Sequence, residues 1–186
     1  MLDGERVRLR AVEPSDVRLL ARWHGDAGYV GEHFNVWPQS EDRWARETGR
    51  DPGPNAGMYV VVGKEEDTAA GTIGYWVPFS RPDLFGGLEV WYRVHPDHRG
   101  RGVATAALCL LVNHLFDATP VPRVQATVVV GNHASCRVAL KAGMQHDGVY
   151  RRVYFLHGRW VDCDLYSIVR EDWRDESTYR RGRPPF

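Results

Sequence analysis

The sequence predicts a single domain of the α/β class, in its α+β form, organised around a parallel β-α-β unit. The 186 residues are 43% hydrophobic and 26% charged, which is an ordinary globular composition at single-domain length. Apolar residues alternate with period two in some segments and recur every three or four residues in others. Read along the chain, these periods give the order β-α-α-β-β-β-α-β-α-β-β.

The first half of the chain supplies four of the expected strands. Residues 6–10 alternate apolar and basic side chains, which is typical of a half-exposed strand. A helix should open at Pro14, because proline favours the first turn of a helix. A loop or broken helix is expected over 25–38 and a second helix from about Ser40. After the breaker at 51–55, strands are expected over 58–63, 70–78 and 87–94.

The second half contains the β-α-β unit. An apolar stripe predicts a helix over 102–117, and the β-branched run 124–130 is typical of a strand covered on both faces. Together with strand 87–94 they should form a right-handed parallel crossover. A helix over 132–142 and strands over 145–155 and 160–169 follow. We expect one domain over 1–173 and a flexible tail over 174–186.

Composition excludes several classes of function. Lys and Arg number 24 and so do Asp and Glu, so no global basic field attracts nucleic acid or a membrane surface. No run of roughly 18 apolar residues could span a bilayer. The N-terminus lacks a secretion signal, and three widely spaced cysteines suit free thiols, so a cytoplasmic location is expected. The histidines show no metal-ligand spacing, so no metal is expected.

The most informative segment joins strand 87–94 to helix 102–117. Gly100 and Gly102 stand where the helix begins, so backbone N–H groups can approach a ligand closely. A helix start also offers unpaired donors and a partial positive charge, which suits a pyrophosphate. Val103 and Ala104 stand where a P-loop requires Lys and Ser or Thr, and the third glycine of a dinucleotide fingerprint is missing.

Several ordered motifs resemble one family. Arg99-x-x-Gly102-x-Ala104 resembles the R/Q-x-x-G-x-G/A signature of the GCN5-related N-acetyltransferase (GNAT) superfamily. Residues 88–96 are similar to its fourth strand, 132–144 to its later motif, and 148–150 and 162–168 to its ending. The opening 7–16 resembles the RimJ/RimL-type branch, which acetylates N-termini of ribosomal proteins and also small amines. The resemblance covers residues 4–173. It implies a mixed, mostly antiparallel seven-stranded sheet with helices on both faces.

The resemblance also implies a site for acetyl-CoA. The pyrophosphate would lie on the backbone of Arg99, Gly100, Arg101, Gly102, Val103, Ala104 and Thr105. In the family the fourth strand bulges and splays from the fifth, which here opens a slot between Tyr92–Val94 and Val128–Val130. A backbone donor such as that of Val94 would hold the thioester carbonyl. Asn132 would contact the pantetheine arm or an ordered water.

Three side chains are candidates for the chemistry. Glu89, on the strand that lines the slot, is the candidate base, and otherwise an exposed or salt-bridged carboxylate. His95 is the alternative base, since the ordinary pKa of histidine suits proton transfer near neutrality; otherwise it belongs to the loop before Pro96. Ser135 is the candidate acid, or else a helix cap. Many family members place a tyrosine one turn later, where Ala139 stands here.

The acceptor should meet the variable, aromatic-rich segments 29–37, 76–85 and 150–155. The residues expected to bind it are Phe34, Trp37, Trp76, Glu89 and Tyr150, although several of these aromatics could instead belong to the core.

These observations predict an acyl-CoA-dependent N-acyltransferase that acetylates a primary amine of a small molecule or a peptide N-terminus by direct attack. The alternatives are another donor on the same fold, such as a longer acyl-CoA or an aminoacyl-tRNA, and a non-catalytic acyl-CoA-binding module. A homodimer is compatible with this fold.

Overall fold

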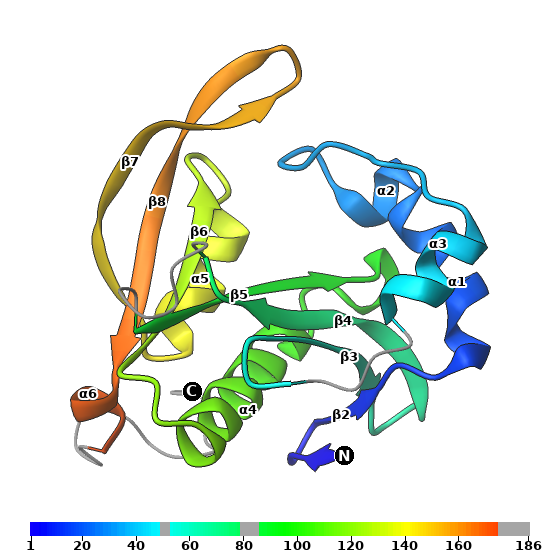
Figure 1. Ribbon diagram of the computed structural model, residues 1–186, viewed down its shortest axis with the longest axis horizontal. Helices are drawn as coiled ribbons and strands as arrows, with labels where there is room; N and C mark the ends of the chain where they lie inside the picture. Colours follow the sequence, from blue (N-terminus) through cyan, green and yellow to red (C-terminus); the bar gives the residue numbers. More distant parts are fainter. Residues whose placement is uncertain (49–52, 79–85, 175–186) are drawn as a thin grey trace.

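The computed structural model describes residues 1–48, 53–78 and 86–174, which form an eight-stranded mixed sheet (Figure 1). The strand order is β1-β2-β3-β4-β5-β6-β8-β7. The bounds are β1 Leu2–Asp3, β2 Val7–Ala11, β3 Ala56–Gly63, β4 Thr68–Trp76, β5 Gly87–Val94, β6 Arg123–Val129, β7 Gln145–Leu156 and β8 Arg159–Val169. The predicted tail, apart from residue 174, lies outside the described residues.

The predicted sheet lacked one strand. The additional strand, β1, is two residues long and pairs antiparallel with β2, Leu2 lying opposite Leu9. Two residues are too few for an alternating pattern to be read from a sequence. All neighbouring strands pair antiparallel except β5 and β6, which are parallel, as the β-α-β prediction required.

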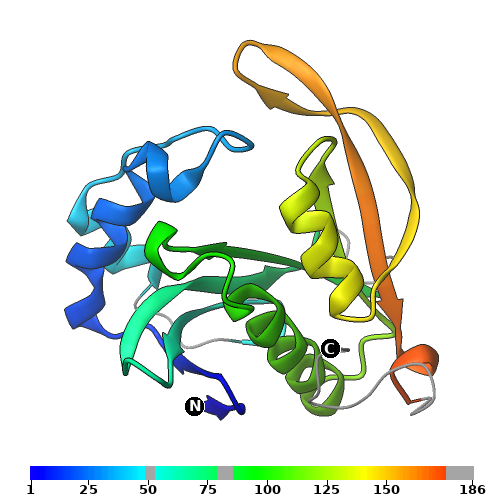
Figure 2. The ribbon, with the colours of Figure 1, turned by 180° about the vertical axis from the view of Figure 1, so that it is seen from behind.

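Helices cover both faces of the sheet (Figure 2). Their bounds are α1 Val17–His24, α2 Ala27–Val30, α3 Glu41–Thr48, α4 Val103–Ala118, α5 His133–Lys141 and α6 Arg170–Arg174. Short 3-10 turns at Pro14–Asp16 and Pro96–His98 precede α1 and the loop to α4. Pro14 therefore opens a 3-10 turn that leads into α1, and the expected broken helix contains the single turn α2.

The two faces of the sheet have separate hydrophobic cores. Leu108 and Leu111 of α4 pack with Ala139 of α5 and with Val124 of β6 on one face. Leu20, Trp23, Tyr29 and Trp44 of α1–α3 form a second cluster on the other face. Strand β6 is covered on both sides, since Val124 belongs to the main core and Val129 to a third cluster. The continuous apolar run of β6 follows from this double burial.

The sheet opens between β5 and β6, which form the one parallel pair of strands among the described residues. β5 and β6 are in register only from Gly87–Arg123 to Glu89–Gln125. Beyond Glu89, β5 continues to pair with β4, and β6 continues to pair with β8. The two strands therefore part in the middle of the sheet, and the opening lies next to the N-termini of α4 and α5 (Figure 1).

Candidate active site

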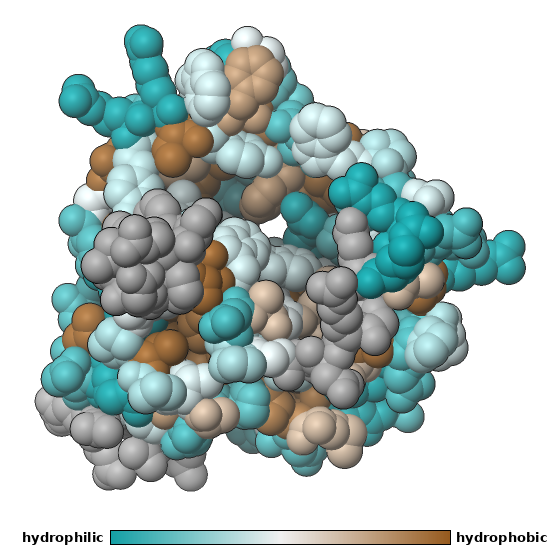
Figure 3. All heavy atoms as spheres, viewed as in Figure 1, coloured by the Kyte–Doolittle hydropathy of each residue, from teal (hydrophilic) through white to brown (hydrophobic). Residues whose placement is uncertain are grey.

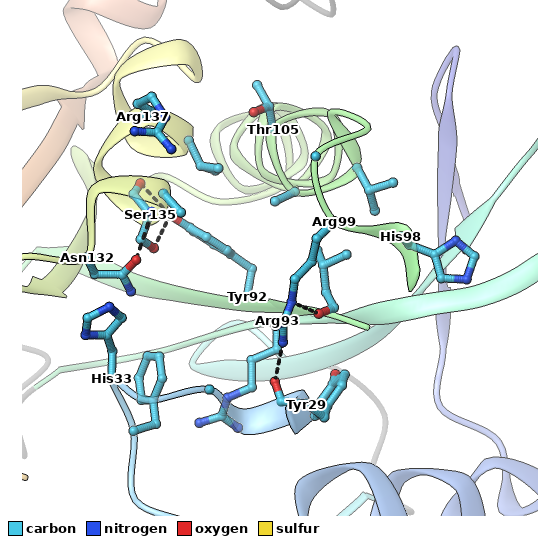
Figure 4. A pocket seen from close by; sticks show the side chains of 18 of the residues that line it. Tyr29, His33, Tyr92, Arg93, His98, Arg99, Thr105, Asn132, Ser135 and Arg137 are labelled. Carbon is cyan, nitrogen blue, oxygen red and sulfur yellow. Dashed lines mark hydrogen bonds between the residues drawn. The ribbon is translucent and has the colours of Figure 1, made fainter. Parts of the chain in front are cut away.

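A pocket of about 520 Å³ lies where β5 and β6 part, a usual size for a small-molecule site. The turn before α4, the end of β5, the first turns of α5 and the segment 29–34 all line it (Figure 4). Of the predicted coenzyme-binding residues it brings together Tyr92, Val94, Arg99, Gly100, Gly102, Val103, Ala104, Thr105, Asn132 and Ser135. Arg101 does not line the pocket, because its guanidinium pairs with Glu66 at 2.8 Å.

The turn before α4 presents main-chain donors to this pocket. Gly100 and Gly102 have φ of +75° and +78°, a left-handed conformation that favours glycine. No side chain caps α4, and Ala106 is the first of its residues to bond back, to the carbonyl of Gly102. Among the described residues, the amides of 103–105 therefore have no protein acceptor. This end of α4 suits an anion.

The side chain of Arg99 braces the turn. Its Nε donates to the carbonyl of Val94 at 3.0 Å, and its Nη2 donates to the carbonyls of Gly28 and Tyr29 at 2.8 and 3.0 Å (Figure 4). The arginine of the sequence motif thus ties the turn to β5 and α2. Its position leaves the backbone of the turn to face the pocket.

A pair of hydroxyl groups lies on the α5 side of the pocket. Ser135 Oγ donates to Tyr92 Oη at 2.9 Å, and Tyr92 Oη donates to the Ser135 carbonyl at 3.1 Å. Burial raises the pKa of Tyr92 to about 12, so the phenol remains protonated at neutral pH. The cap of α5 is Asn132, whose Oδ1 accepts the Ser135 N–H at 3.1 Å. The Ser135 hydroxyl is therefore not the helix cap.

One expectation about β5 is wrong. The family resemblance implied a bulge in this strand, but β4 and β5 pair without a register shift from Gly71–Val94 to Trp76–Glu89. The opening arises on the other edge of β5, where β6 turns away to follow β8.

Strand alternation divides β5 between two sides of the sheet. Leu88, Val90 and Tyr92 pack toward α4 and α5, which we call the coenzyme side. Glu89, Trp91 and Arg93 alternate with them and face the opposite side, which we call the acceptor side.

Glu89 lies in the last β5–β6 pair, at the closed end of the opening and on the acceptor side, and it does not itself line the pocket. Its Oε2 accepts from Gln125 Nε2 at 3.2 Å, and burial raises its pKa above the ordinary glutamate value. It forms no ion pair with any described residue, and a carboxyl group whose pKa is raised toward neutrality suits a general base.

The alternative base, His95, lies elsewhere. Its ring packs on Trp23, with ring centroids 5.3 Å apart, and its backbone N–H donates to the carbonyl of Ala70. His95 does not line the pocket, whereas His98 does and pairs with Glu66 at 3.2 Å.

The predicted acceptor residues lie on or near the acceptor side. Trp76 is 39% exposed and lies opposite Glu89 on β4. Tyr150 lies opposite Cys163 in the β7–β8 pair. Phe34 packs edge-on against Tyr154, with ring centroids 6.3 Å apart. Trp37 is 71% exposed and projects into solvent.

The segment that carries Phe34 reaches the β7–β8 hairpin. Asn35 Nδ2 donates to the Phe155 carbonyl at 2.7 Å, and His157 Nε2 lies 3.0 Å from the Glu32 carbonyl. These contacts close the acceptor side over β5, and a hollow remains between the two segments (Figure 3).

Sequence reasoning missed three residues that line this pocket. Arg137 and Lys141, one turn apart on α5, line it beside the α4 turn, and their spacing of four residues was a readable signal. Arg93 also lines it, and its alternation with Tyr92 placed it on the face of Glu89. Tyr154, in contrast, lies in the segment 150–155 that was expected to form part of the acceptor pocket, and it packs on Phe34 from a distant segment. Of the expected segment 76–85, residues 79–85 lie outside the described residues.

The comparison with known families decides the class of protein. An acetyltransferase (GNAT) domain matches residues 6–145, most of the chain. The chain is a GNAT N-acetyltransferase. It belongs to the RimJ/RimL-type family, and enzymes of the GNAT family use acetyl-CoA as the donor.

Individual relatives resemble this GNAT enzyme at low identity. An uncharacterized N-acetyltransferase, p20 of Bacillus licheniformis, is 25% identical over 175 residues, which cover 91% of this chain and 96% of that protein. The uncharacterized N-acetyltransferase YoaA of Bacillus subtilis is 35% identical over 82 residues, only 44% of this chain and 46% of that protein.

Solved structures share the fold. RimL, a ribosomal α-N-protein acetyltransferase solved with coenzyme A, superposes with a TM-score of 0.75 at 19% identity, covering 89% of this chain and 95% of that one. The spermidine N-acetyltransferase SpeG of Vibrio cholerae gives 0.74 at 18%, covering 92% and 98%. At these identities the likeness establishes the fold of the GNAT enzyme and leaves its acceptor open.

Two kinds of feature are absent from the described residues. No group of three or more His, Cys, Asp or Glu side chains is arranged there to hold a metal ion. No helix within the described ranges is long and apolar enough to cross a membrane. Cys109, Cys136 and Cys163 are not in disulfide bonds, and Cys136, next to Ser135, is partly buried against the main core.

Proposed function

We propose that this enzyme transfers the acetyl group of acetyl-CoA to a primary amine, on a small molecule or a peptide N-terminus, by direct attack. The observation that carries the proposal is the uncapped first turn of α4, which lies beside the opening between β5 and β6. An anion-binding helix end next to a gap in a sheet suits a ligand that joins a diphosphate to an extended arm. Coenzyme A has this shape.

The coenzyme would enter along the coenzyme side. Its diphosphate would meet the amides of residues 100–105, and Arg137 and Lys141 would add positive charge nearby. Its pantetheine arm would lie along the edge of β5 that β6 leaves free beyond Glu89. Backbone donors on this edge, with Val94 as the candidate, would stabilise the oxyanion that forms at the thioester carbon.

The amine must lose a proton before or during attack. A lysine-like ammonium has a pKa near 10.4, so most of it is charged at neutral pH. Glu89, on the acceptor side, would accept this proton directly or through a water. Its raised pKa brings the carboxylate closer to the basicity that such a transfer requires.

The departing thiolate must gain a proton or a hydrogen bond. Ser135 Oγ lies in the pocket with Tyr92 Oη 2.9 Å behind it. Rotation of the serine hydroxyl would let it donate to the sulfur while the tyrosine hydroxyl stays near it. This pair would take the place of the tyrosine that many relatives carry where Ala139 stands here.

The test is a mass-spectrometric screen of amines and ribosomal peptides with acetyl-CoA as donor, using the wild-type chain and Glu89→Gln. We expect stoichiometric acetylation of at least one amine class by the wild type and strongly reduced acetylation by the variant. Coenzyme A affinity, measured by calorimetry, should be the same for both. Full turnover by Glu89→Gln would remove the assigned role of Glu89, and no measurable affinity for coenzyme A would refute the proposal.

A further inference from the structure

Arg93 is a partly buried cation that faces the acceptor side, and no described residue supplies a counter-charge to it. It lines the pocket, and Figure 4 shows its side chain running from β5 toward the segment that carries His33, away from Tyr92. It lies opposite Thr72 of β4, on the face that also carries Glu89 and Trp91.

The hydrogen bonds of the Arg93 guanidinium leave most of its donors unused. Nη1 lies 2.9 Å from His24 Nδ1, and Nε is buried without a hydrogen-bond partner. No described residue forms an ion pair with it. An arginine stays charged even when burial lowers its pKa, so this positive charge is uncompensated. A buried charge without a partner is costly, and such charges are normally paired.

The histidine beside Arg93 does not supply the missing charge. Burial, followed by the charge of Arg93, lowers the pKa of His24 to about 4. His24 is therefore neutral at physiological pH and offers Arg93 a nitrogen lone pair only. A further polar neighbour on this side, Tyr29, is neutral as well, since burial raises its pKa to about 12.

Aromatic rings hold the guanidinium in place. The Arg93 Cζ lies 4.7 Å from the centroid of the Phe34 ring and 5.9 Å from that of the Trp91 ring. Both distances lie within cation–π range. Contacts with the faces of two rings leave the N–H edge of the guanidinium for a ligand, and this edge matches a carboxylate in bidentate geometry.

We propose that Arg93 binds a carboxylate of the acceptor, so that the preferred acceptors are amines that also carry a carboxylate. This inference rests on the proposed function and specifies its substrate class. Glu89 and Arg93 are four residues apart on one strand face, which separates their Cα atoms by about 13 Å. An extended spacer therefore fits between amine and carboxylate, as in an ω-amino acid or a short acidic peptide. A polyamine would bring only positive charge to Arg93.

Matched acceptor pairs test this assignment. Each pair is an ω-amino acid and its terminal carboxamide, which differ in charge and hardly in size. The pairs cover spacers of two to six methylenes between the amine and the carboxylate or carboxamide. Affinity is measured by calorimetry with coenzyme A present, and kcat/KM with acetyl-CoA. We expect the wild type to prefer the carboxylate by at least about tenfold, a difference of about 1.4 kcal/mol, with the preference greatest at one of the longer spacers.

Variants separate binding from a purely structural role. Arg93→Gln should abolish the preference while the constants for the carboxamide change less than about threefold, and Arg93→Lys should retain part of the preference. Arg18→Gln, at a side chain that is 89% exposed on α1, is the control and should retain all of it. An equal loss for both members of each pair in Arg93→Gln would instead show that Arg93 only braces the Phe34 segment, and would overturn the proposal.

The wild-type comparison stands even if Arg93→Gln does not fold. Equal affinities of the wild type for carboxylate and carboxamide at every spacer would overturn the proposal and leave the acetyltransferase function intact. A preference in binding without acetylation of any acceptor would support the role of Arg93 and refute the proposed function.

Discussion

The coenzyme side and the acceptor side of β5 present different chemistry to a ligand. On the coenzyme side, one continuous segment from Val94 to Thr105 presents main-chain amides, fixed by two glycines with positive φ. On the acceptor side, the ligand would meet side chains from segments far apart in the chain, such as Phe34, Arg93 and Tyr154. A backbone site has a local sequence signature, whereas a side-chain site depends on the tertiary fold. The family therefore shares the donor, while the acceptor can vary with a few side chains.

The largest expected effect lies on the coenzyme side. Gly102→Glu should weaken coenzyme A binding by about 100-fold or more, roughly 3 kcal/mol. The substitution strains a left-handed residue and adds a carboxylate where a diphosphate should lie. Calorimetry with coenzyme A measures this. Gly158→Glu is the matched control, because Gly158 also has a positive φ and also accommodates an added Cβ without a clash, but lies in the β7–β8 turn. A similar loss in both variants would point to general strain.

Glu89→Gln should lower kcat about 100-fold, the usual contribution of a general base, and leave coenzyme affinity unchanged. Since the carboxylate is the base, wild-type kcat/KM should rise as pH increases through the pKa of Glu89, and the variant should lose this rise.

The same Glu89→Gln substitution should raise the stability of the protein although it lowers the activity. A carboxyl group whose pKa is raised by burial costs stability as pH increases through that pKa, so Glu89→Gln should raise Tm at neutral pH. A variant that is both less active and less stable would indicate that Glu89 is structural.

A smaller effect is expected at the hydroxyl pair. Ser135→Ala should lower kcat about tenfold, and Tyr92→Phe less than that, because the serine oxygen would donate to the thiolate and the tyrosine supports it. Acyl donors with a poorer thiol leaving group should widen the difference between the two variants. If Tyr92→Phe proves the more damaging change, the tyrosine is the proton donor and the roles of the two groups are reversed.

The smallest effect is expected at Trp37, on the acceptor side. Its side chain is 71% exposed, so Trp37→Ala should change Tm little and KM for the acceptor by less than about threefold. Steady-state kinetics with the best acceptor from the screen measures this. A tenfold rise in KM would show that the acceptor reaches past Phe34 to this segment. Trp37 would then count among the residues that bind the acceptor.

The same contrast explains what could be predicted from the sequence. The turn from Val94 to Thr105 was found because glycine spacing and helix start are local features. The parallel pairing of β5 and β6 followed from the order of elements. Strand β1 was missed because it is two residues long, and the bulge in β5 was wrong because the opening depends on the course of β6.

The acceptor side was harder to predict for a physical reason. Glu89 and Arg93 share a face by alternation alone. That no described residue supplies a counter-charge to Arg93 becomes visible only when its neighbours from α1 and the Phe34 segment are in place. Imidazole is a common general base, yet packing on Trp23 places His95 away from the pocket.

The most direct test concerns the amides of residues 100–105 themselves. In a 15N-labelled sample titrated with coenzyme A, these amide resonances should shift and their hydrogen exchange should slow, while the amide of Gly158 should be unaffected. Pantetheine, which lacks the diphosphate of coenzyme A, should leave the same resonances unchanged. Saturable binding of coenzyme A that leaves the amides of 100–105 unmoved would contradict the placement of the diphosphate on this helix end.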